Sequence, residues 1–200
     1  MLFRSQINGL NQAVNNANDA IGLIQTAEGA MTETHSMLQR MKTLTTQAAN
    51  GTYTKTARDN IQAEVNALNK EITRIASTTK FNGETPLSPA KKEQNLTFFI
   101  GATADKTNAM TVGQLTMTAA ALTIDKIKVD STTNAFKAMA SVDAAIEKVS
   151  TYRATLGAAQ NRLEHTVNNL KVTSENITSA ESRIRDTDMA DEMTRFSKES

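Results

Sequence analysis

The feature that most restricts the fold of this chain is an unbroken heptad repeat over residues 142–187. Every seventh position carries a large aliphatic side chain, and the residue three positions later is small or a threonine, except for Tyr152. The aliphatic positions are Val142, Val149, Leu156, Leu163, Leu170, Ile177 and Ile184. A sustained 3.5-residue repeat places one narrow seam along a helix, as in coiled coils. A helix over this stretch is roughly 70 Å long, so the repeat predicts a rod.

A second heptad begins near the N-terminus. It comprises Ile7, Leu10, Val14, Ala17, Ile21 and Ile24. The next positions in this register are Glu28, His35 and Lys42, which do not suit a seam. We therefore expect the apolar stripe to shift round one long helix over residues 5–49, which packs on one partner early and on two later. Asn50-Gly51 supplies a stop, with Gly51 able to take a left-handed C-cap.

A shorter helix is predicted over residues 57–78. Its apolar positions are Ile61, Val65, Leu68, Ile72 and Ile75, at steps of four and three. Thr54 or Thr56 can cap it. The turn signal at residues 81–83, followed by Pro86 and Pro89, ends the helix.

The chain changes character over residues 94–129. Alternating apolar residues predict two or three short strands, including one at residues 96–100, joined by a hairpin around residues 105–108. Residues 116–121 can equally form a helical turn. A long helix over residues 133–190 follows, capped by Ser131, Thr132 or Thr133. The expected fold is mainly α, an elongated bundle of two long helices and one shorter helix with a small β-hairpin segment, in one domain over residues 1–200.

Composition supports a thin helical bundle and excludes several functions. Aromatic residues make up only 4% of the chain, and 22 Lys and Arg balance 21 Asp and Glu, so neither nucleic acid nor an anionic membrane is indicated as a partner. Cysteine is absent, which excludes a thiol nucleophile and a disulfide framework. No cleavable signal peptide and no run of about 18 apolar residues is visible.

Candidate catalytic residues are few. His35 and His165 lie within predicted helices without a carboxylate cluster around them, and each is interpreted as an ordinary surface or half-buried residue. The charged residues at 183–186 and 188–192 lack the spacing of a calcium loop and are interpreted as a solvated helix end. No nucleophile and base can be paired from their spacing. We therefore predict no enzymatic activity, no metal and no cofactor.

Short motifs at both ends of the chain resemble bacterial flagellin. The N-terminal half carries QTAEGA (25–30), LQRM (38–41), QAAN (47–50), NIQAEV (60–65) and KFNG (80–83), and FFIGA (98–102) is similar to the first hairpin strand of the family. The C-terminal half carries LGAAQNRLEH (156–165), SENI (174–177), ESRIRD (181–186) and MA (189–190). The motifs follow the family's order and span most of the chain. The segment 84–133 matches least, and its shortness resembles the short flagellins of Bacillus-like bacteria.

The resemblance implies a structural subunit of the extracellular flagellar filament. Such subunits are exported unfolded through the flagellar apparatus, with export chaperones as partners. Flagellins normally extend beyond this region at both ends, so we expect a rod-domain fragment that stays monomeric; filaments detected by light scattering would contradict this. A hook-associated junction protein and a helical signalling adaptor are the alternatives.

The resemblance also implies recognition by the innate immune Toll-like receptor 5. The family's receptor epitope maps onto Arg40, Leu44 and Glu64, with Gln39 beside them. Arg40 and Leu44, four residues apart, share a helix face. Leu44 also fits the apolar stripe, so a core role for it is the alternative. Lys42-Thr43 stands where many recognised flagellins have Arg-Glu, which is expected to weaken the contact.

Overall fold

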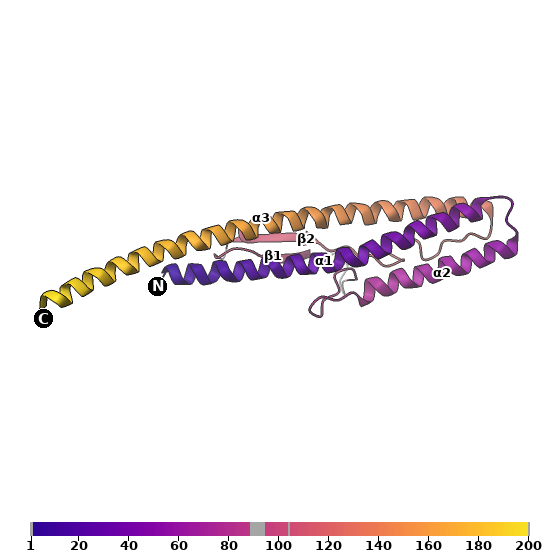
Figure 1. The fold of residues 1–200 in the computed structure, drawn as a ribbon. Coiled ribbons are helices and arrows are strands. Elements are labelled where there is room, and N and C mark those ends of the chain that lie inside the picture. Colours follow the sequence, from indigo (N-terminus) through magenta and orange to yellow (C-terminus); the bar gives the residue numbers. More distant parts are fainter. Residues whose placement is uncertain (1, 89–94, 104, 200) are drawn as a thin grey trace. The chain divides into compact units, whose positions relative to one another are not determined.

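The computed structural model describes residues 2–88, 95–103 and 105–199. It confirms a mainly helical chain with two long helices, one shorter helix and a small two-stranded antiparallel sheet (Figure 1). The elements in chain order are α1 (Leu2–Ala49), α2 (Lys55–Thr78), β1 (Asn95–Phe99), the 3-10 helix η1 (Lys106–Asn108), β2 (Ala109–Gly113) and α3 (Thr132–Glu199).

The chain forms two compact units. Unit 1 comprises Met1–Ile21, Thr97–Thr111 and Gln160–Ser200. Unit 2 comprises Gly22–Leu96 and Val112–Ala159. Each long helix contributes its residues to both units. The prediction of a single domain over residues 1–200 stays a prediction.

The buried seam of α1 is one unbroken heptad repeat, and the predicted shift of its stripe is wrong. Steps of three and four run through buried Leu10, Ala13, Ala17, Ala20, Ile24, Ala27, Met31, Thr34, Leu38, Met41, Thr45 and Ala48. Val14 and Ile21, which the prediction placed in the seam, are only half-buried. Small Ala and Thr side chains let the neighbouring helix approach closely at these positions, so the seam needs no large residue there.

The predicted seam of α3 is confirmed over its first half. Ala135 and Ala138 extend it at the N-terminal end, and every seam position from Val142 to Leu163 is buried, with Tyr152 only 3% exposed. Burial then declines along the helix: Leu170 is half-buried and Ile184 is 50% exposed. The apolar repeat therefore continues past the residues that cover it in the described part of the chain.

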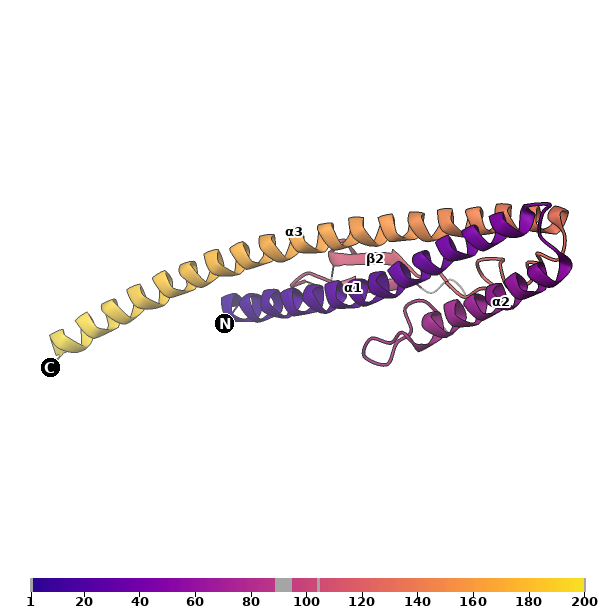
Figure 2. The ribbon, with the colours of Figure 1, turned by 45° about the vertical axis from the view of Figure 1, so that its right-hand side comes forward.

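In unit 2 the second part of α1 packs on α2 and on the first part of α3, which runs antiparallel to it (Figures 1 and 2). Lys42 Nζ lies 2.7 Å from Asp143 Oδ1, and Arg153 Nη2 lies 3.5 Å from Glu28 Oε1. Helix α2 buries Ile61, Val65 and Ile72, as predicted, whereas the predicted Leu68 and Ile75 are only half-buried. Its N-cap is Thr54, whose hydroxyl accepts a hydrogen bond from the N–H of Ala57. Ser131 caps α3 in the same way.

In unit 1 the start of α1 packs on two neighbours rather than the predicted one. Arg4 and Asn11 of α1 contact α3, through Glu181 and Ser174. The end of the β-hairpin also lies against α1, because the Asn16 amide donates to the Phe99 carbonyl at 3.0 Å. The hairpin supplies the second partner that the sequence pattern did not indicate.

The β segment forms one hairpin, and the third strand considered for it is absent from the described residues. Gly101 is required in this hairpin because the Asn108 side chain occupies the position where a Cβ atom would stand. After β2 the chain makes a helical turn in which Leu122 N–H donates to Thr118 O. A helical turn here was the predicted alternative to a strand. Residues 114–131 otherwise run as an irregular segment whose main-chain groups bond to α2 side chains.

The end of α1 differs from its prediction. Gly51 does not take a left-handed conformation, and Gly83 is the one described glycine with a positive φ. Instead the Arg58 guanidinium of α2 donates to the carbonyls of Ala48 and Asn50, at 2.9 and 3.0 Å. These carbonyls at the helix end lack intrahelical partners, so an arginine from the next helix replaces the glycine cap.

Candidate functional site

The sequence-predicted site is centred on an ion pair between α1 and α2. Arg40 Nε donates to Glu64 Oε1 at 2.8 Å, and the two side chains are 54% and 43% exposed. The hydrogen bond, and then the attraction between the charges, raises the pKa of Arg40 above its usual value. Both residues arise from outward-facing positions of neighbouring helices, so the pair presents charge and hydrogen-bonding groups to solvent.

Gln39 and Leu44 lie on opposite sides of the same helical stretch. Gln39 is exposed, and its amide nitrogen lies 3.4 Å from His35 Nε2. Leu44 is 2% exposed and belongs to the core of unit 2. The structure therefore brings Arg40, Glu64 and Gln39 to the surface and places Leu44 beneath them.

The two residues that depart from the family motif are also at the surface. Lys42 is paired with Asp143 of α3, and the Thr43 hydroxyl donates to the Gln39 carbonyl at 3.2 Å. A threonine in this position bonds to its own helix. It offers no carboxylate to a partner, unlike the acidic residue of the motif.

A polar row on α2, which sequence reasoning missed, holds the segment after β2. Gln62 accepts the N–H of Val129 at 2.8 Å and donates to a main-chain carbonyl, and Thr73 accepts the N–H of Ala119 at 3.2 Å. Asn69, 6% exposed, donates to the Ile124 carbonyl at 2.7 Å. The spacing of these polar residues, at positions 62, 69 and 73, was the available signal: one polar stripe beside the apolar one.

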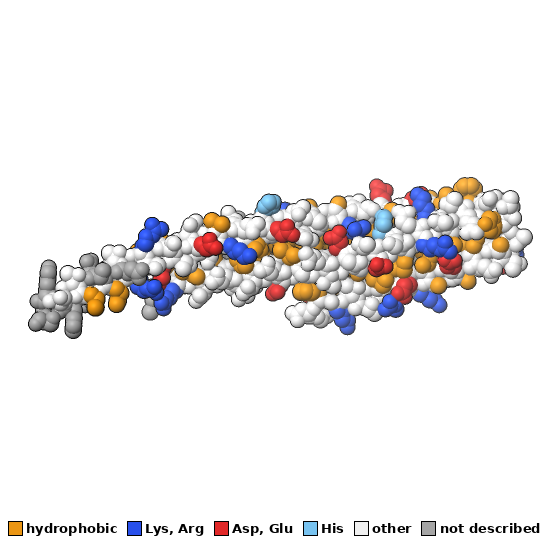
Figure 3. Space-filling view, in the orientation of Figure 1, with side chains coloured by type: hydrophobic (Ala, Val, Ile, Leu, Met, Phe, Trp, Pro, Cys, Tyr) orange, Lys and Arg blue, Asp and Glu red, His pale blue; other side chains and the backbone are white. Residues whose placement is uncertain are grey.

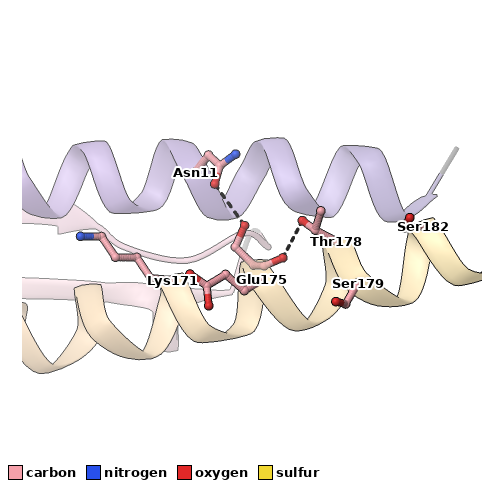
Figure 4. Close-up of a pocket in the computed structure, with 7 residues that line it drawn as sticks. Asn11, Lys171, Glu175, Thr178, Ser179 and Ser182 are labelled. Atoms are coloured by element: carbon pink, nitrogen blue, oxygen red, sulfur yellow. Dashed lines mark hydrogen bonds between the residues drawn. The ribbon is translucent and has the colours of Figure 1, made fainter.

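A groove in unit 1 is lined by small polar side chains (Figure 4). It has a volume of about 510 Å³ and lies between α1 and α3. Its lining residues are Asn11, Lys171, Ser174, Glu175, Thr178, Ser179 and Ser182. Ser174 donates to Asn11 across the groove, and Thr178 donates to the Ser174 carbonyl. The Ser174 hydroxyl therefore joins the two helices, whereas the Thr178 hydroxyl bonds within α3.

His35 is half-buried and His165 is exposed. Among the described residues, no group of three or more His, Cys, Asp or Glu side chains is placed to hold a metal ion. In that same part of the chain, no helix is both long and apolar enough to cross a membrane. Acidic and basic side chains alternate along the face in Figure 3, where no large patch of one sign gathers.

Comparison with known families gives matches at both ends of the chain. Residues 2–92 match the bacterial flagellin N-terminal helical region, and residues 139–200 match the bacterial flagellin C-terminal helical region. A flagellin of Bacillus subtilis is 44% identical, over 98% of this chain and 74% of its own length. A flagellar filament 33 kDa core protein of Treponema phagedenis is 43% identical, over 98% of this chain and 73% of its own.

Solved structures agree with these relatives. The flagellin of Bacillus cereus is 31% identical with a TM-score of 0.67, over 84% of this chain and 94% of that one. A hook-associated protein of Vibrio parahaemolyticus, described as putative, has a TM-score of 0.54 at 15% identity, over 92% of each chain, and shares the fold alone. The chain therefore belongs to the bacterial flagellin family, a family of structural filament subunits.

Proposed function

We propose that this chain forms part of a subunit that assembles with other flagellin subunits into the extracellular flagellar filament, after export through the flagellar apparatus with the help of an export chaperone. The family matches over residues 2–92 and 139–200 carry this proposal. The α3 side chains that stay exposed although apolar support it. The large ones are Phe136, Val172, Ile184, Met189 and Met193. Such positions are suited to burial against a neighbouring subunit.

The position of the chain within the flagellum tests this proposal. An antibody raised against the chain should label the filament of the bacterium that encodes it along its whole length under the electron microscope. Labelling confined to the junction between hook and filament would favour the hook-associated alternative. A signalling adaptor would label no filament, and the proposal would then be wrong.

We further propose that the surface around Arg40 and Glu64 binds Toll-like receptor 5. An arginine paired with a carboxylate, with one side open to solvent, supplies the directional hydrogen bonds that interface hot spots use. Gln39 adds an exposed amide beside the pair. Leu44 acts from below, by fixing the helix on which Arg40 and Gln39 stand, rather than by touching the receptor.

The substitution Arg40→Ala tests the receptor surface. Loss of a hot-spot arginine should reduce the response of receptor-expressing cells by roughly tenfold or more. Arg74→Ala is the matched control, because Arg74 is 60% exposed and forms an ion pair within α2, with Glu71. An equal response of both variants would show that Arg40 is not part of the receptor-binding surface.

A gain of response is expected from restoring the acid of the family motif. Thr43 is exposed, so Thr43→Glu disturbs no buried contact. If the receptor meets this face, the new carboxylate should strengthen signalling, whereas the neutral isostere Thr43→Gln should not. Leu44→Ala is a poor test, because emptying a core position destabilises the helix and lowers the response indirectly.

A further inference from the structure

The chain contains three Asn-Gly pairs. The pair at positions 8–9 lies within α1, and the pairs at positions 50–51 and 82–83 lie in exposed turns. Asparagine is a thermolabile residue. It can cyclise when the main-chain nitrogen of the next residue attacks the side-chain carboxamide. Glycine permits this reaction best because it has no Cβ to hinder the approach. The two pairs in turns differ in the hydrogen bonds around them.

Asn50 follows the last residue of α1, and a main-chain hydrogen bond already contacts its side-chain oxygen. Its Oδ1 accepts a hydrogen bond from the main-chain N–H of Thr52 at 3.2 Å. When the carboxamide carbon is attacked, Oδ1 gains negative charge, and a donor already aimed at it stabilises that charge. The space beside Gly51 is open, as it is beside Gly83: no heavy atom lies within 4 Å of the position of either missing Cβ. The hydrogen bond to Oδ1 therefore distinguishes Asn50, and the open space does not.

Asn82 is held in a closed turn. Asn82 and Gly83 have φ values of 49° and 86°, which is the pattern of a type I′ turn. Phe81 and Glu84 exchange two main-chain hydrogen bonds across it, at 2.9 and 3.0 Å. Rotating the Asn82 backbone into a ring-closing conformation breaks these bonds. No described residue donates a hydrogen bond to the Asn82 carboxamide.

We propose that Asn50 is a site of spontaneous deamidation and isoaspartate formation, and that the turn at Asn82 resists it. The main-chain nitrogen of Gly51 loses its proton to hydroxide or a buffer base and bonds to Asn50 Cγ. The Cγ–Nδ2 bond breaks and ammonia leaves, which gives a succinimide. Water then adds to either imide carbonyl, so the products are aspartate or β-linked isoaspartate, with no oxidation or reduction.

The reaction changes the connection between α1 and α2. Each product adds a negative charge, and the β-linked product adds one carbon to the main chain at residue 50. The Asn50 carbonyl is one of the two that Arg58 binds. Isoaspartate at this position moves that carbonyl and disturbs the Arg58 cap, whereas Asn82 lies beyond the C-terminal end of α2.

The test follows both sites in the same folded chain. The whole chain is incubated at mildly alkaline pH and mapped by peptide mass spectrometry, with isoaspartate counted by enzymatic methylation. Asn50 should react about fivefold faster than Asn82 or more, the factor that one hydrogen bond of ordinary net strength supplies. In concentrated urea the two rates should converge, because both turns are lost. Equal folded rates, or a faster Asn82, would overturn the proposal.

Two substitutions at Thr52 isolate the donor. Thr52→Pro removes the N–H and should slow deamidation of Asn50 about fivefold. Thr52→Ala keeps the N–H and should leave the deamidation rate unchanged. Circular dichroism melting checks that both variants fold, and the rate at Asn82 serves as an internal reference. A Thr52→Pro chain that folds and deamidates at the unaltered rate would show that the hydrogen bond has no part in the reaction.

Discussion

The buried amide of Asn69 offers the sharpest test of how α2 is held. Its Nδ2 donates to the Ile124 carbonyl at 2.7 Å, and the side chains of both residues are buried. The other donor to that carbonyl is the N–H of Ile127, at the long distance of 3.5 Å. The substitution Asn69→Ala therefore leaves a buried carbonyl with one weak partner.

The cost can be worked out from this arrangement. Removing one partner of a buried hydrogen bond costs about 1–3 kcal/mol, because the remaining group is kept from water without compensation. The lost side-chain volume adds to this cost, so we expect the free energy of unfolding to fall by about 2 kcal/mol or more. Asn66→Ala is the matched control: Asn66 lies one turn earlier on α2, is exposed and bonds only to Gln62, so we expect a change within about 0.5 kcal/mol.

Urea unfolding followed by circular dichroism measures both variants. Hydrogen exchange of the amides of Ala119 and Val129, which bond to α2 side chains, reports the local opening of the segment. Asn69→Asp should lower the free energy of unfolding more than Asn69→Ala at neutral pH, because a carboxylate cannot donate to the carbonyl. In acid the protonated carboxyl can donate, so the stability of Asn69→Asp should recover. Equal stability of the Asn69→Ala and Asn66→Ala chains would refute this reasoning.

Three further predictions concern the seam, the acid range and the buried phenol. Leu163→Ala should cost about 2–5 kcal/mol and Ile184→Ala under about 1 kcal/mol by urea unfolding, because the first is fully buried and the second 50% exposed. The hydrogen bond from Asn134 lowers the pKa of Asp130. The contribution of the Asp130 carboxylate to folding stability is therefore present above the ordinary carboxyl pKa and is lost as pH falls below about 4. Asp130→Ala should flatten that part of the pH–stability curve. Burial raises the pKa of Tyr152, so in an ultraviolet titration of the folded chain its phenol should ionise above the ordinary tyrosine pKa, and Tyr152→Phe should remove that step.

The two seams show what a sequence pattern can predict. The α3 seam could be predicted because large aliphatic residues mark every seventh position. The α1 seam was misjudged because Ala13, Ala20 and Thr34 carry little hydrophobicity, while the larger Val14 and Ile21 lie on its flank. Burial in a narrow seam depends on how closely the helices approach, which composition does not state.

The candidate site divides in the same way. The family motif named Arg40, Leu44 and Glu64 as receptor residues, and that assignment stays a prediction. The apolar spacing offered a core role for Leu44 as the alternative, and the burial of its side chain agrees with that alternative. The cap that Arg58 forms could not be predicted, because its partners are main-chain carbonyls that carry no sequence signal. The contact of α2 with the segment after β2 was signalled only in part. The polar stripe at positions 62, 69 and 73 indicates that this face of α2 has a polar partner, but not which segment it is, because that segment lies far away along the chain.

If the proposed receptor surface is right, the Arg40–Glu64 hydrogen bond limits how the receptor can bind it. In the free chain the two side chains satisfy each other, and an exposed pair of this kind contributes little to stability. A receptor that takes Arg40 alone must compete with Glu64, so Glu64→Ala should then strengthen binding. A receptor that meets the pair as a unit loses a preorganised arginine and a carboxylate, so the same substitution should weaken binding, and a double-mutant cycle with Arg40→Ala should show coupling. The hydrogen bond that already joins the pair at 2.8 Å favours the second outcome, and a Glu64→Ala chain that binds more tightly would exclude it.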